Sequence, residues 1–504
     1  MPPLRIILLL IATTACAVER SPLTNRMSHA TTSYLARAAR QPVGWQPWGR
    51  DAFALAERLD RPVLLYVGAR DCRWCAVMDR EVFGDRTLGA LIDSLFVPVR
   101  VDRDERPDVA RRYQGAVQAL AGLRGLPLTV FLTPEGSAFF GGTYFPADDP
   151  VGGRGLRQIL PEVARSFREQ RAFVEQHAAL VGQLAGGRSA VSHGVLRADA
   201  LRFEIGTVRG AIDVVVGRPA MLGSVPHAQA VGLLFREFAF SADSGALQTA
   251  QAALAFLVDS LAATGGERED PPDLVRAGLL RVLAFAWAVT GEPRYRSAGL
   301  SIVQTLGADL EHADHGPLFA DHEAYRIAAL LDGAPALGDT LAAERARATL
   351  DALLRGVYRP RRPVRHAAGD PAPGLLQDHV QLATACLAAH DLTGDVRYLD
   401  VARDLAAVLD REFADPLGGY FDAAQADPAA PDQMERTKQV LDDVLPGANA
   451  AAAAGLLRLF RATGDSSYKR RAEAVLEAFA AGIGGEGVRA ATYLTVAREA
   501  LAAR

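Results

Sequence analysis

Cysteine is scarce in this 504-residue chain, which carries only four, and neither sign of charge predominates. So few cysteines exclude a scaffold stapled by many disulfides. The 59 acidic and 55 basic side chains leave a net charge of -4 without a run of like charge, so nothing in the composition favours nucleic-acid binding. The chain exceeds the about 250 to 300 residues at which single cores stop growing, so two folded domains are expected.

The N-terminus has the pattern of an export signal. Residues 1–17 contain Arg5, an apolar stretch and then the small-residue sequence Ala15-Cys16-Ala17, which is typical of a cleavage site. The apolar stretch is shorter than the about 20 residues of a membrane span. Two processing routes stay open: cleavage by a signal peptidase, or lipidation of Cys16, which is the one expected route to a membrane. A frayed apolar tail and a mis-assigned start codon also remain as alternatives to these two routes. The first two predict an extracytoplasmic protein, either periplasmic or secreted.

Short apolar runs rich in strand formers alternate with helical segments in the first third of the chain, and a turn at 133–136 leads into Phe139-Phe140. Three of these runs suit strands buried on both faces: residues 62–67, 96–101 and 128–132. The alternation predicts βαβ units on a small mixed sheet, in an α/β domain over residues 25–182.

A linker is predicted at 183–200, where Gly, Ser and Ala replace the periodic pattern. Residues 201–504 then show apolar residues at helical spacing and almost no strand signal. One phrase recurs there between helical segments: Thr290-Gly291-Glu292-Pro293-Arg294-Tyr295, Thr393-Gly394-Asp395-Val396-Arg397-Tyr398, Thr463-Gly464-Asp465-Ser466-Ser467-Tyr468, and a weaker copy at 241–247. A glycine just past a helix end supplies a left-handed cap, so repeated helical hairpins are expected, stacked as an all-α (α/α) toroid in preference to a simple bundle.

The sequence Cys72-Arg73-Trp74-Cys75 is the candidate catalytic site. It lies between a predicted strand and a helical run at 77–83, which places Cys72 at a helix N-terminus, where the helix dipole and free backbone N–H groups favour a thiolate. We predict that Cys72 is the nucleophile and Cys75 the resolving thiol of a redox-active dithiol. Arg70 and Arg73 favour the thiolate and Asp71 opposes it, so the sign of their net effect stays open.

Two further positions belong to this candidate site. A thioredoxin-type strand carries a buried acid six residues before the first cysteine, where this chain has Tyr66. The segment Arg124-Gly125-Leu126-Pro127-Leu128 has the form of the thioredoxin loop whose cis proline lies opposite the dithiol. With Pro127 cis, the backbone of Leu126 can pair with an extended partner segment, so protein thiols or disulfides are the expected partners.

Two other interpretations of the cysteine pair stay open, a structural disulfide and half of a zinc site. Zinc needs two more ligands, and the remaining cysteine, Cys386, lies mid-helix, where a small buried hydrophobe is the ordinary role. No cofactor and no metal are therefore predicted.

The N-terminal motifs resemble those of the spermatogenesis-associated protein 20 family, also called DUF255. The resemblance rests on Asn25-Arg26, Ser33-Tyr34-Leu35, Pro42-Val43-Gly44-Trp45-Gln46-Pro47-Trp48, the cysteine motif with Val77-Met78, residues 101–109 and Phe140-Gly141-Gly142-Thr143-Tyr144-Phe145-Pro146, with later landmarks at 418–422 and 446–449. It implies a thioredoxin-like domain fused to an (α/α)6 toroid of the six-hairpin glycosidase type.

The chain departs from the family pattern at several points. The family's Cys-His-Trp-Cys-His core is Cys72-Arg73-Trp74-Cys75-Ala76 here, and Ala38 and Arg40 replace two upstream histidines. Any histidine-assisted chemistry beside the thiols is therefore in doubt. A Gly-rich segment and a Pro-His-Phe-Glu-Lys-Met stretch are missing around 265–273, and Arg276-Ala277 replaces an Asp-Asn pair. These losses predict a toroid that is incomplete relative to (α/α)6 and has lost much of its polar lining.

Glycoside chemistry requires two carboxyl groups about 5 to 10 Å apart. No spacing singles out a pair among the candidates Asp314, Asp321, Glu323, Asp378, Glu412, Asp442 and Asp443 or the neighbouring His315, His322 and His379. An inner face of the toroid lined by aromatic side chains is a further option, against ordinary core packing: Phe235, Phe238, Phe240, Trp287 and Tyr420. Thiol–disulfide exchange or redox sensing is the first function hypothesis. A carbohydrate-binding or carbohydrate-active toroid and a non-catalytic interaction protein with a degenerate site are the alternatives.

Overall fold

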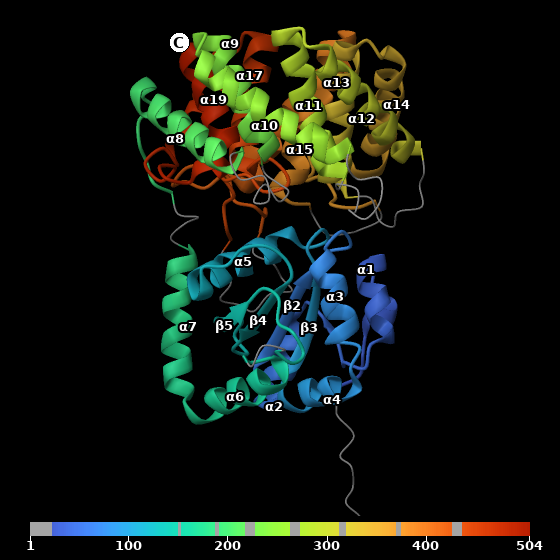
Figure 1. Ribbon diagram of the computed structural model, residues 1–504, viewed down its shortest axis with the longest axis vertical. Helices are drawn as coiled ribbons and strands as arrows, with labels where there is room; N and C mark the ends of the chain where they lie inside the picture. The colour runs from blue at the N-terminus through green and yellow to red at the C-terminus, as the bar shows by residue number, and fades with distance from the viewer. Residues whose placement is uncertain are drawn as a thin grey trace, which may run out of the picture.

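The computed structural model divides the chain into an N-terminal α/β domain and a C-terminal helical domain (Figure 1). It describes residues 23–149, 153–186, 191–216, 227–262, 273–311, 319–368, 374–425 and 436–503. The predicted export signal lies outside these residues. None of the described helices has both the length and the apolarity that crossing a membrane requires.

A mixed sheet forms the centre of the N-terminal domain. Its strands are β1 (Gln46–Pro47), β2 (Val63–Gly68), β3 (Val97–Asp102), β4 (Leu128–Leu132) and β5 (Ala138–Gly142). They lie in the order β1-β3-β2-β4-β5, with the first three parallel and the last two antiparallel to their neighbours. The three predicted apolar strands are confirmed within one residue, because helices cover both faces of the sheet and bury every side chain of β2, β3 and β4.

Seven α-helices are described in this domain. They are α1 (Ser33–Arg37), α2 (Arg50–Leu59), α3 (Arg73–Glu81), α4 (Arg86–Leu95), α5 (Pro107–Ala121), α6 (Leu156–Glu169) and α7 (Arg171–Gly186), with short 3-10 turns at Met27–His29 and Ala38–Arg40. One core joins α1, α3, α4 and α6 to the sheet face that carries Leu64 and Tyr66, and the other joins α2 and α5 to the face that carries Val63 and Leu65. Side chains alternate across a strand, so Tyr66 faces the same side as α3.

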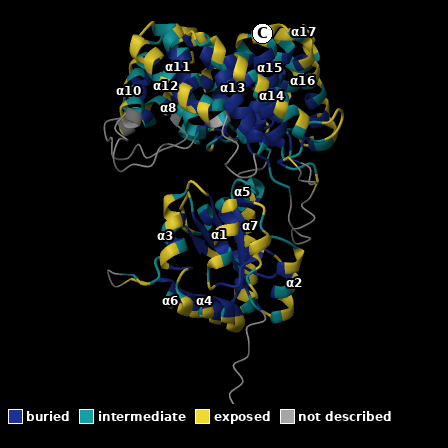
Figure 2. Cartoon of the chain, turned by 90° about the vertical axis from the view of Figure 1, so that its right-hand side faces the viewer, coloured by how far each residue is buried: buried dark blue, intermediate teal, exposed yellow. Residues whose placement is uncertain are grey.

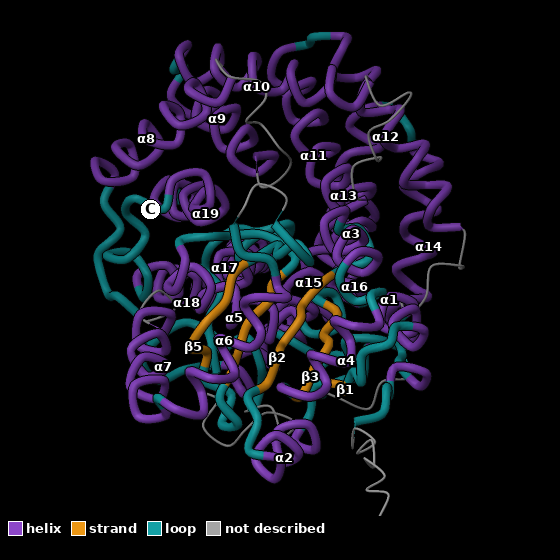
Figure 3. The backbone as a smooth tube through the Cα atoms, turned by 60° about the horizontal axis from the view of Figure 1, so that its bottom comes forward, coloured by secondary structure: helices purple, strands orange, loops and turns teal. Residues whose placement is uncertain are grey.

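In the described part of the helical domain, twelve helices alternate between an inner and an outer layer (Figure 3). The inner ones are α9 (His227–Ser241), α11 (Asp273–Thr290), α13 (Ala320–Leu337), α15 (Leu376–Thr393), α17 (Ala448–Thr463) and α19 (Ala491–Ala502). The outer ones are α8 (Ala198–Val216), α10 (Ser244–Ala262), α12 (Pro293–Glu311), α14 (Thr340–Val357), α16 (Val396–Val408), which continues into a π-helical turn at Leu409–Phe413, and α18 (Ser466–Glu477); a 3-10 turn at Gly487–Ala490 precedes α19.

Each inner helix packs against the next, and α19 returns to α9 and α8, so the toroid closes as a ring. The shortened sequence around 265–273 had predicted an incomplete ring, and most of that segment lies outside the described residues. The ring closes because the first outer helix, α8, pairs with the last inner helix, α19, and supplies the sixth inner–outer pair. In Figure 2 dark blue, buried residues fill the interior of both domains and exposed residues mark the outward sides of the helices.

The recurring Thr-Gly phrase forms the turn from an inner to an outer helix, as predicted. Gly291, Gly394 and Gly464 have φ angles of 70°, 71° and 71°, in the left-handed region that glycine adopts without strain. At the second copy, the hydroxyl of Thr393 accepts a hydrogen bond from the Asp395 N–H at 3.2 Å. The phrase is thus a local signal that fixes each hairpin independently of the rest of the ring.

The linker is shorter than the predicted 183–200. Helix α7 runs to Gly186 and α8 begins at Ala198. Between them, the N–H groups of Ser192 and Gly194 donate hydrogen bonds to the carbonyls of Ala478 and Glu477 at 2.8 and 2.9 Å. The second half of the predicted linker therefore belongs to the helical domain, because its backbone is held there by hydrogen bonds that composition does not reveal.

Candidate functional site

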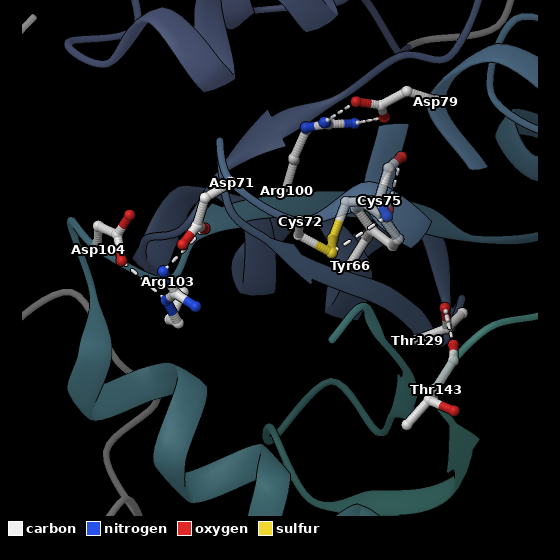
Figure 4. The surroundings of a disulfide bond; sticks show 10 residues. All are labelled: Tyr66, Asp71, Cys72, Cys75, Asp79, Arg100, Arg103, Asp104, Thr129 and Thr143. Carbon is white, nitrogen blue, oxygen red and sulfur yellow. Dashed lines mark hydrogen bonds and ion pairs between the residues drawn. A yellow bond between two sulfur atoms is a disulfide. The ribbon is translucent and has the colours of Figure 1, made fainter. Parts of the chain in front are cut away.

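Cys72 and Cys75 are joined by a disulfide at the start of α3 (Figure 4). Cys72 is the N-cap residue, and its sulfur accepts a hydrogen bond from the Cys75 N–H at 3.1 Å. The side chain of Cys72 is half-buried, whereas Cys75 is fully buried. The predicted position of Cys72 at a helix N-terminus is confirmed, and the first sulfur is the more accessible of the two.

The surface beside the disulfide carries an exposed aromatic side chain. Trp74 is 54% exposed, and its ring centroid lies 4.9 Å from that of Tyr144. Arg73 is exposed as well. The Leu126–Pro127 peptide bond is cis, as expected, and the following residue, Leu128, pairs with Val67 of β2. The predicted partner loop thus begins β4 next to the strand that leads to the cysteines.

Tyr66, which replaces the expected acid, lies in a buried polar cluster behind the disulfide. Its hydroxyl donates a hydrogen bond to the Cys75 carbonyl at 3.4 Å, and burial raises its pKa well above the usual value. Next to it, the Arg100 guanidinium makes two hydrogen bonds of 2.7 and 2.8 Å with the Asp79 carboxylate. Sequence reasoning missed Arg100 and Asp79, because a charged residue in a strand and another in a helix carry no sign of their pairing.

The packing against this cluster is tight at Gly68, the last residue of β2. A Cβ atom there would overlap the hydroxyl of Tyr34 and lie 3.2 Å from the Cys75 sulfur. Glycine is therefore needed at this position for the close approach of α1 and α3 to the sheet.

A buried acid does occur at the site, but on a neighbouring strand. Asp102 ends β3 in register with Gly68, so it lies on the sheet face that Cys75 packs against. Burial, helped by the charge of Asp104, raises the pKa of Asp102 to about 6. Asp102 was not among the predicted site residues; its signal in the sequence is an acid at the end of an apolar run.

Asp71, the residue before Cys72, is paired with a cation. Its carboxylate lies 3.0 Å from Nη2 of Arg103, whose Nε donates to the Asp104 carboxylate at 2.8 Å (Figure 4). Arg103 follows β3 directly, and its N–H donates to the Gly68 carbonyl at 2.8 Å. The negative charge of Asp71, the residue before Cys72, is therefore balanced by an arginine that the sequence did not single out.

The loop after β3 also contacts the helical domain. Nε2 of His366 lies 2.9 Å from the Asp104 carbonyl oxygen, and Nδ1 lies 2.9 and 3.1 Å from the two carboxylate oxygens of Asp378 at the start of α15. A second contact joins Arg111 of α5 to Asp422 at 3.5 Å. In Figure 1, α5 lies on the side of the N-terminal domain that faces the ring. His366 was not a candidate in sequence, because it lies in an irregular stretch without helical or strand periodicity.

Asp321, His366 and Asp378 offer ligand atoms within 4.8 Å of one another, which raises the question of a metal ion. Their donors and acceptors are already engaged by the protein. The Asp378 carboxylate accepts hydrogen bonds from the backbone N–H groups of Asp321 and Leu375 at 3.1 and 2.7 Å, and both nitrogens of His366 face oxygen atoms. This set fits a protonated imidazole between oxygen acceptors better than a metal ion.

The other predicted carboxylates of the toroid have separate partners. Glu323 pairs with Arg326, and Glu412 pairs with Arg411 at 2.8 Å. Asp442 is buried and accepts hydrogen bonds from the N–H groups of Gly447 and Thr492 at 2.9 and 2.8 Å, while Asp443 is exposed. Asp314 and His315 lie outside the described residues. Of these candidates, the structure brings together Asp321 and Asp378.

The remaining predicted toroid residues are mostly parts of the core. His379 is buried, with Nε2 accepting a hydrogen bond from the Val364 N–H at 2.9 Å, and burial lowers its pKa. Cys386 is buried in the ring core, as predicted. The five aromatic candidates divide between core and surface: Phe235 and Tyr420 are buried, Phe238 and Trp287 are half-buried, and Phe240 is exposed. They do not share one environment, so ordinary packing accounts for most of them.

Comparison with known proteins places the relationship in the N-terminal domain. Residues 24–185 match the family described as "Protein of unknown function, DUF255". Spermatogenesis-associated protein 20 of Homo sapiens is 38% identical over 170 residues, which is 34% of this chain and 22% of the relative. Uncharacterized protein B0495.5 of Caenorhabditis elegans is 38% identical over 160 residues, which is 32% of this chain and 22% of the relative. The matched region thus spans about a fifth of the length of these relatives.

Among solved structures, an unsaturated glucuronyl hydrolase specific for heparin is similar to 60% of this chain and 97% of its own, at 14% identity and a TM-score of 0.47. The family resemblance expected from the sequence is confirmed for the N-terminal domain, and the closed ring of helical pairs is established by the fold itself.

Proposed function

Because residues 24–185 belong to the thioredoxin-like DUF255 family, we propose that this domain performs thiol–disulfide exchange at Cys72 and Cys75, as an oxidoreductase or a redox sensor. The observation that carries the proposal is the placement of the pair at the start of α3, with Cys72 half exposed and Cys75 buried. An attacking thiolate must be accessible, whereas a resolving thiol needs only to reach the first sulfur.

The proposed exchange proceeds through a mixed disulfide. In the reduced protein, the Cys72 thiolate attacks one sulfur of a partner disulfide, a new S–S bond forms, and the other partner sulfur leaves as a thiolate. Cys75 then loses its proton to solvent and attacks the Cys72 sulfur, which closes the internal disulfide and releases the second partner thiolate. Two electrons pass from the dithiol to the partner, and the reverse sequence oxidises a partner dithiol.

The expected partners are protein thiols or disulfides. Trp74 offers an exposed apolar surface next to Cys72. The half-buried Leu126 begins the segment that leads into β4, and its backbone is the proposed pairing site for an extended partner segment, with Pro127 shaping the groove. Trp74 lies two residues after Cys72, and Leu128, two residues after Leu126, pairs with Val67 of the strand that leads to the cysteines.

Replacement of Cys75 with serine is expected to trap a covalent partner through Cys72, because the mixed disulfide can no longer be resolved. Non-reducing electrophoresis of the purified full chain, followed by mass spectrometry of the linked peptides, measures the adduct. The matched control is the Cys72→Ser variant, which should trap much less. Absence of an adduct under every redox condition, with a partner retained non-covalently, would instead favour a non-catalytic interaction protein.

We also propose that the protein acts outside the cytoplasm, periplasmic or secreted, after removal of residues 1–17 or lipidation of Cys16. The motivating feature is the sequence pattern of that segment. The intact mass of the protein purified from its native host is expected to lack the signal residues. A mass that includes Met1 and all following residues would overturn this proposal.

Carbohydrate binding by the ring has less support. The two acids that the structure brings together, Asp321 and Asp378, are held by backbone N–H groups and by His366. The loop after β3 of the other domain contacts the same histidine. A sugar that required these carboxylates would have to displace contacts within the protein.

A further inference from the structure

The two domains meet where the inner helices of the ring begin. His366 precedes α15, and Asp378 lies in its first turn. Both ring nitrogens of His366 face oxygen atoms, the Asp378 carboxylate on one side and the Asp104 carbonyl of the other domain on the other. For both contacts to be hydrogen bonds, both nitrogens must carry hydrogen, so the histidine is an imidazolium that links the domains.

A continuous series of contacts leads from this histidine to the cysteines. The Asp104 carboxylate holds Nε of Arg103 at 2.8 Å, and Nη2 of Arg103 holds Asp71 at 3.0 Å. Asp71 is the residue before Cys72 (Figure 4). Arg103 has only 22% of its side chain exposed, so solvent screens these charges less than at an open surface.

We propose that the helical domain positions the dithiol: His366 and Asp378 fix the Asp104 loop so that Arg103 neutralises Asp71 and relieves its repulsion of the Cys72 thiolate. His366 and Asp378 are positioning residues, since neither touches the sulfur atoms. The inference deepens the proposed function, because it concerns the reactivity of the same thiol. It also assigns a role to the ring that requires no ligand of its own.

The charged groups around Arg103 and His366 support the proposal that the helical domain relieves the repulsion of the Cys72 thiolate by Asp71. Arg103 faces Asp71 and Asp104 of its own domain and Asp443 of the helical domain. His366 faces Asp378 and Asp321 from the helical domain. Loss of the histidine removes the hydrogen bond that holds the Asp104 carbonyl to the helical domain. Arg103 is then free to shift toward Asp104 or Asp443, which leaves the negative charge of Asp71 next to the thiolate.

Alkylation of the reduced full chain by iodoacetamide tests the proposal, with the modified Cys72 peptide quantified by mass spectrometry between pH 5 and 9. His366→Ala is expected to move the rate profile to higher pH and to slow alkylation at pH 7 by about threefold or more. The matched control is His390→Ala at the far end of α15. There, Nδ1 of the imidazole lies 3.2 Å from the carbonyl oxygen of Asp395 in the same domain. It should leave the profile unchanged.

Two further variants decide whether the effect travels through Asp71. Arg103→Gln is expected to slow alkylation at least as much as His366→Ala. In an Asp71→Asn background, replacement of His366 should no longer change the profile. A His366→Ala profile that superimposes on that of the parent, or an equal slowing with and without Asp71, would overturn the proposal. Where His366→Ala does not fold, His366→Gln replaces it, with an intermediate slowing expected and a parental rate contradicting the inference.

The outcome separates this inference from the proposed function. Alkylation reports the ionisation of Cys72 whether or not a partner exists, whereas trapping with Cys75→Ser reports exchange with a partner. A shifted profile without a trapped partner supports the positioning role and counts against exchange. A trapped partner with an unshifted profile supports exchange and overturns the positioning role.

Discussion

Replacement of Asp79 with alanine is expected to lower the free energy of unfolding of the thioredoxin-like domain by about 3 to 5 kcal/mol. Asp79 is the counter-ion of Arg100, whose side chain is 0% exposed. The guanidinium also lies over three aromatic rings, with centroid distances of 4.5 Å to Tyr34, 5.5 Å to Trp45 and 5.1 Å to Tyr66. Aromatic faces attract a cation but do not replace a carboxylate, so the variant leaves a buried charge uncompensated.

Urea unfolding of the full chain, monitored by tryptophan fluorescence, measures this decrease in the free energy of unfolding. The matched control is Glu81→Ala on the same helix, since Glu81 is 52% exposed and pairs with the exposed Arg80. Its removal should cost less than about 1 kcal/mol. A double variant, Asp79→Ala with Arg100→Met, is expected to be more stable than Asp79→Ala alone, because it removes the orphaned charge. A cost of Asp79→Ala no larger than that of the control would contradict this account.

Raising the pH from about 7 to about 10 is expected to lower the free energy of unfolding by roughly 2 to 4 kcal/mol through His366. Burial alone would lower the pKa of His366, but the charge and hydrogen bond of Asp378, with the charge of Asp321, outweigh it and raise the pKa to about 10. A cation with a raised pKa contributes stability that is fully present below its unfolded value of about 6.5. That stability is lost as the pH rises through the folded value, so the window is pH 6.5 to 10.

Thermal unfolding of the full chain at a series of pH values tests this prediction. Other groups titrate in the same range, so the informative quantity is the difference between the parent chain and His366→Ala. That difference should be large near pH 7 and shrink toward zero as the pH approaches and passes 10. Parallel curves for the two proteins across this range would show that the histidine is not charged in the folded state.

The parts of the fold that the sequence predicted correctly are those governed by local rules. Continuous apolar runs between turns gave β2, β3 and β4, because burial on both faces demands apolar side chains at every position. The Thr-Gly phrase predicted the hairpin turns, since a left-handed cap depends on the glycine itself. The position of Cys72 at the start of α3 followed in the same way from a strand, a short loop and a helical pattern.

The site was predicted only in part, for a physical reason that its residues illustrate. Tyr66 was identified as a departure, but its neighbours Arg100 and Asp79 come from another strand and a helix, and their pairing exists only once the sheet is covered. Asp102 was missed because strand register, which puts it beside Gly68, is set by the packing of the whole sheet.

The sequence by itself determined the thioredoxin-like domain, the placement of the cysteine pair and the helical hairpins, because each depends on residues close together in the chain. Tertiary structure alone decided that the toroid closes as a ring and that His366, which precedes α15, contacts the loop after β3, next to the dithiol. The contact between His366 and Asp104 joins residues 262 positions apart. Such a pair leaves no periodicity in either segment, because its partners lie in two different domains and meet only where the domains contact each other.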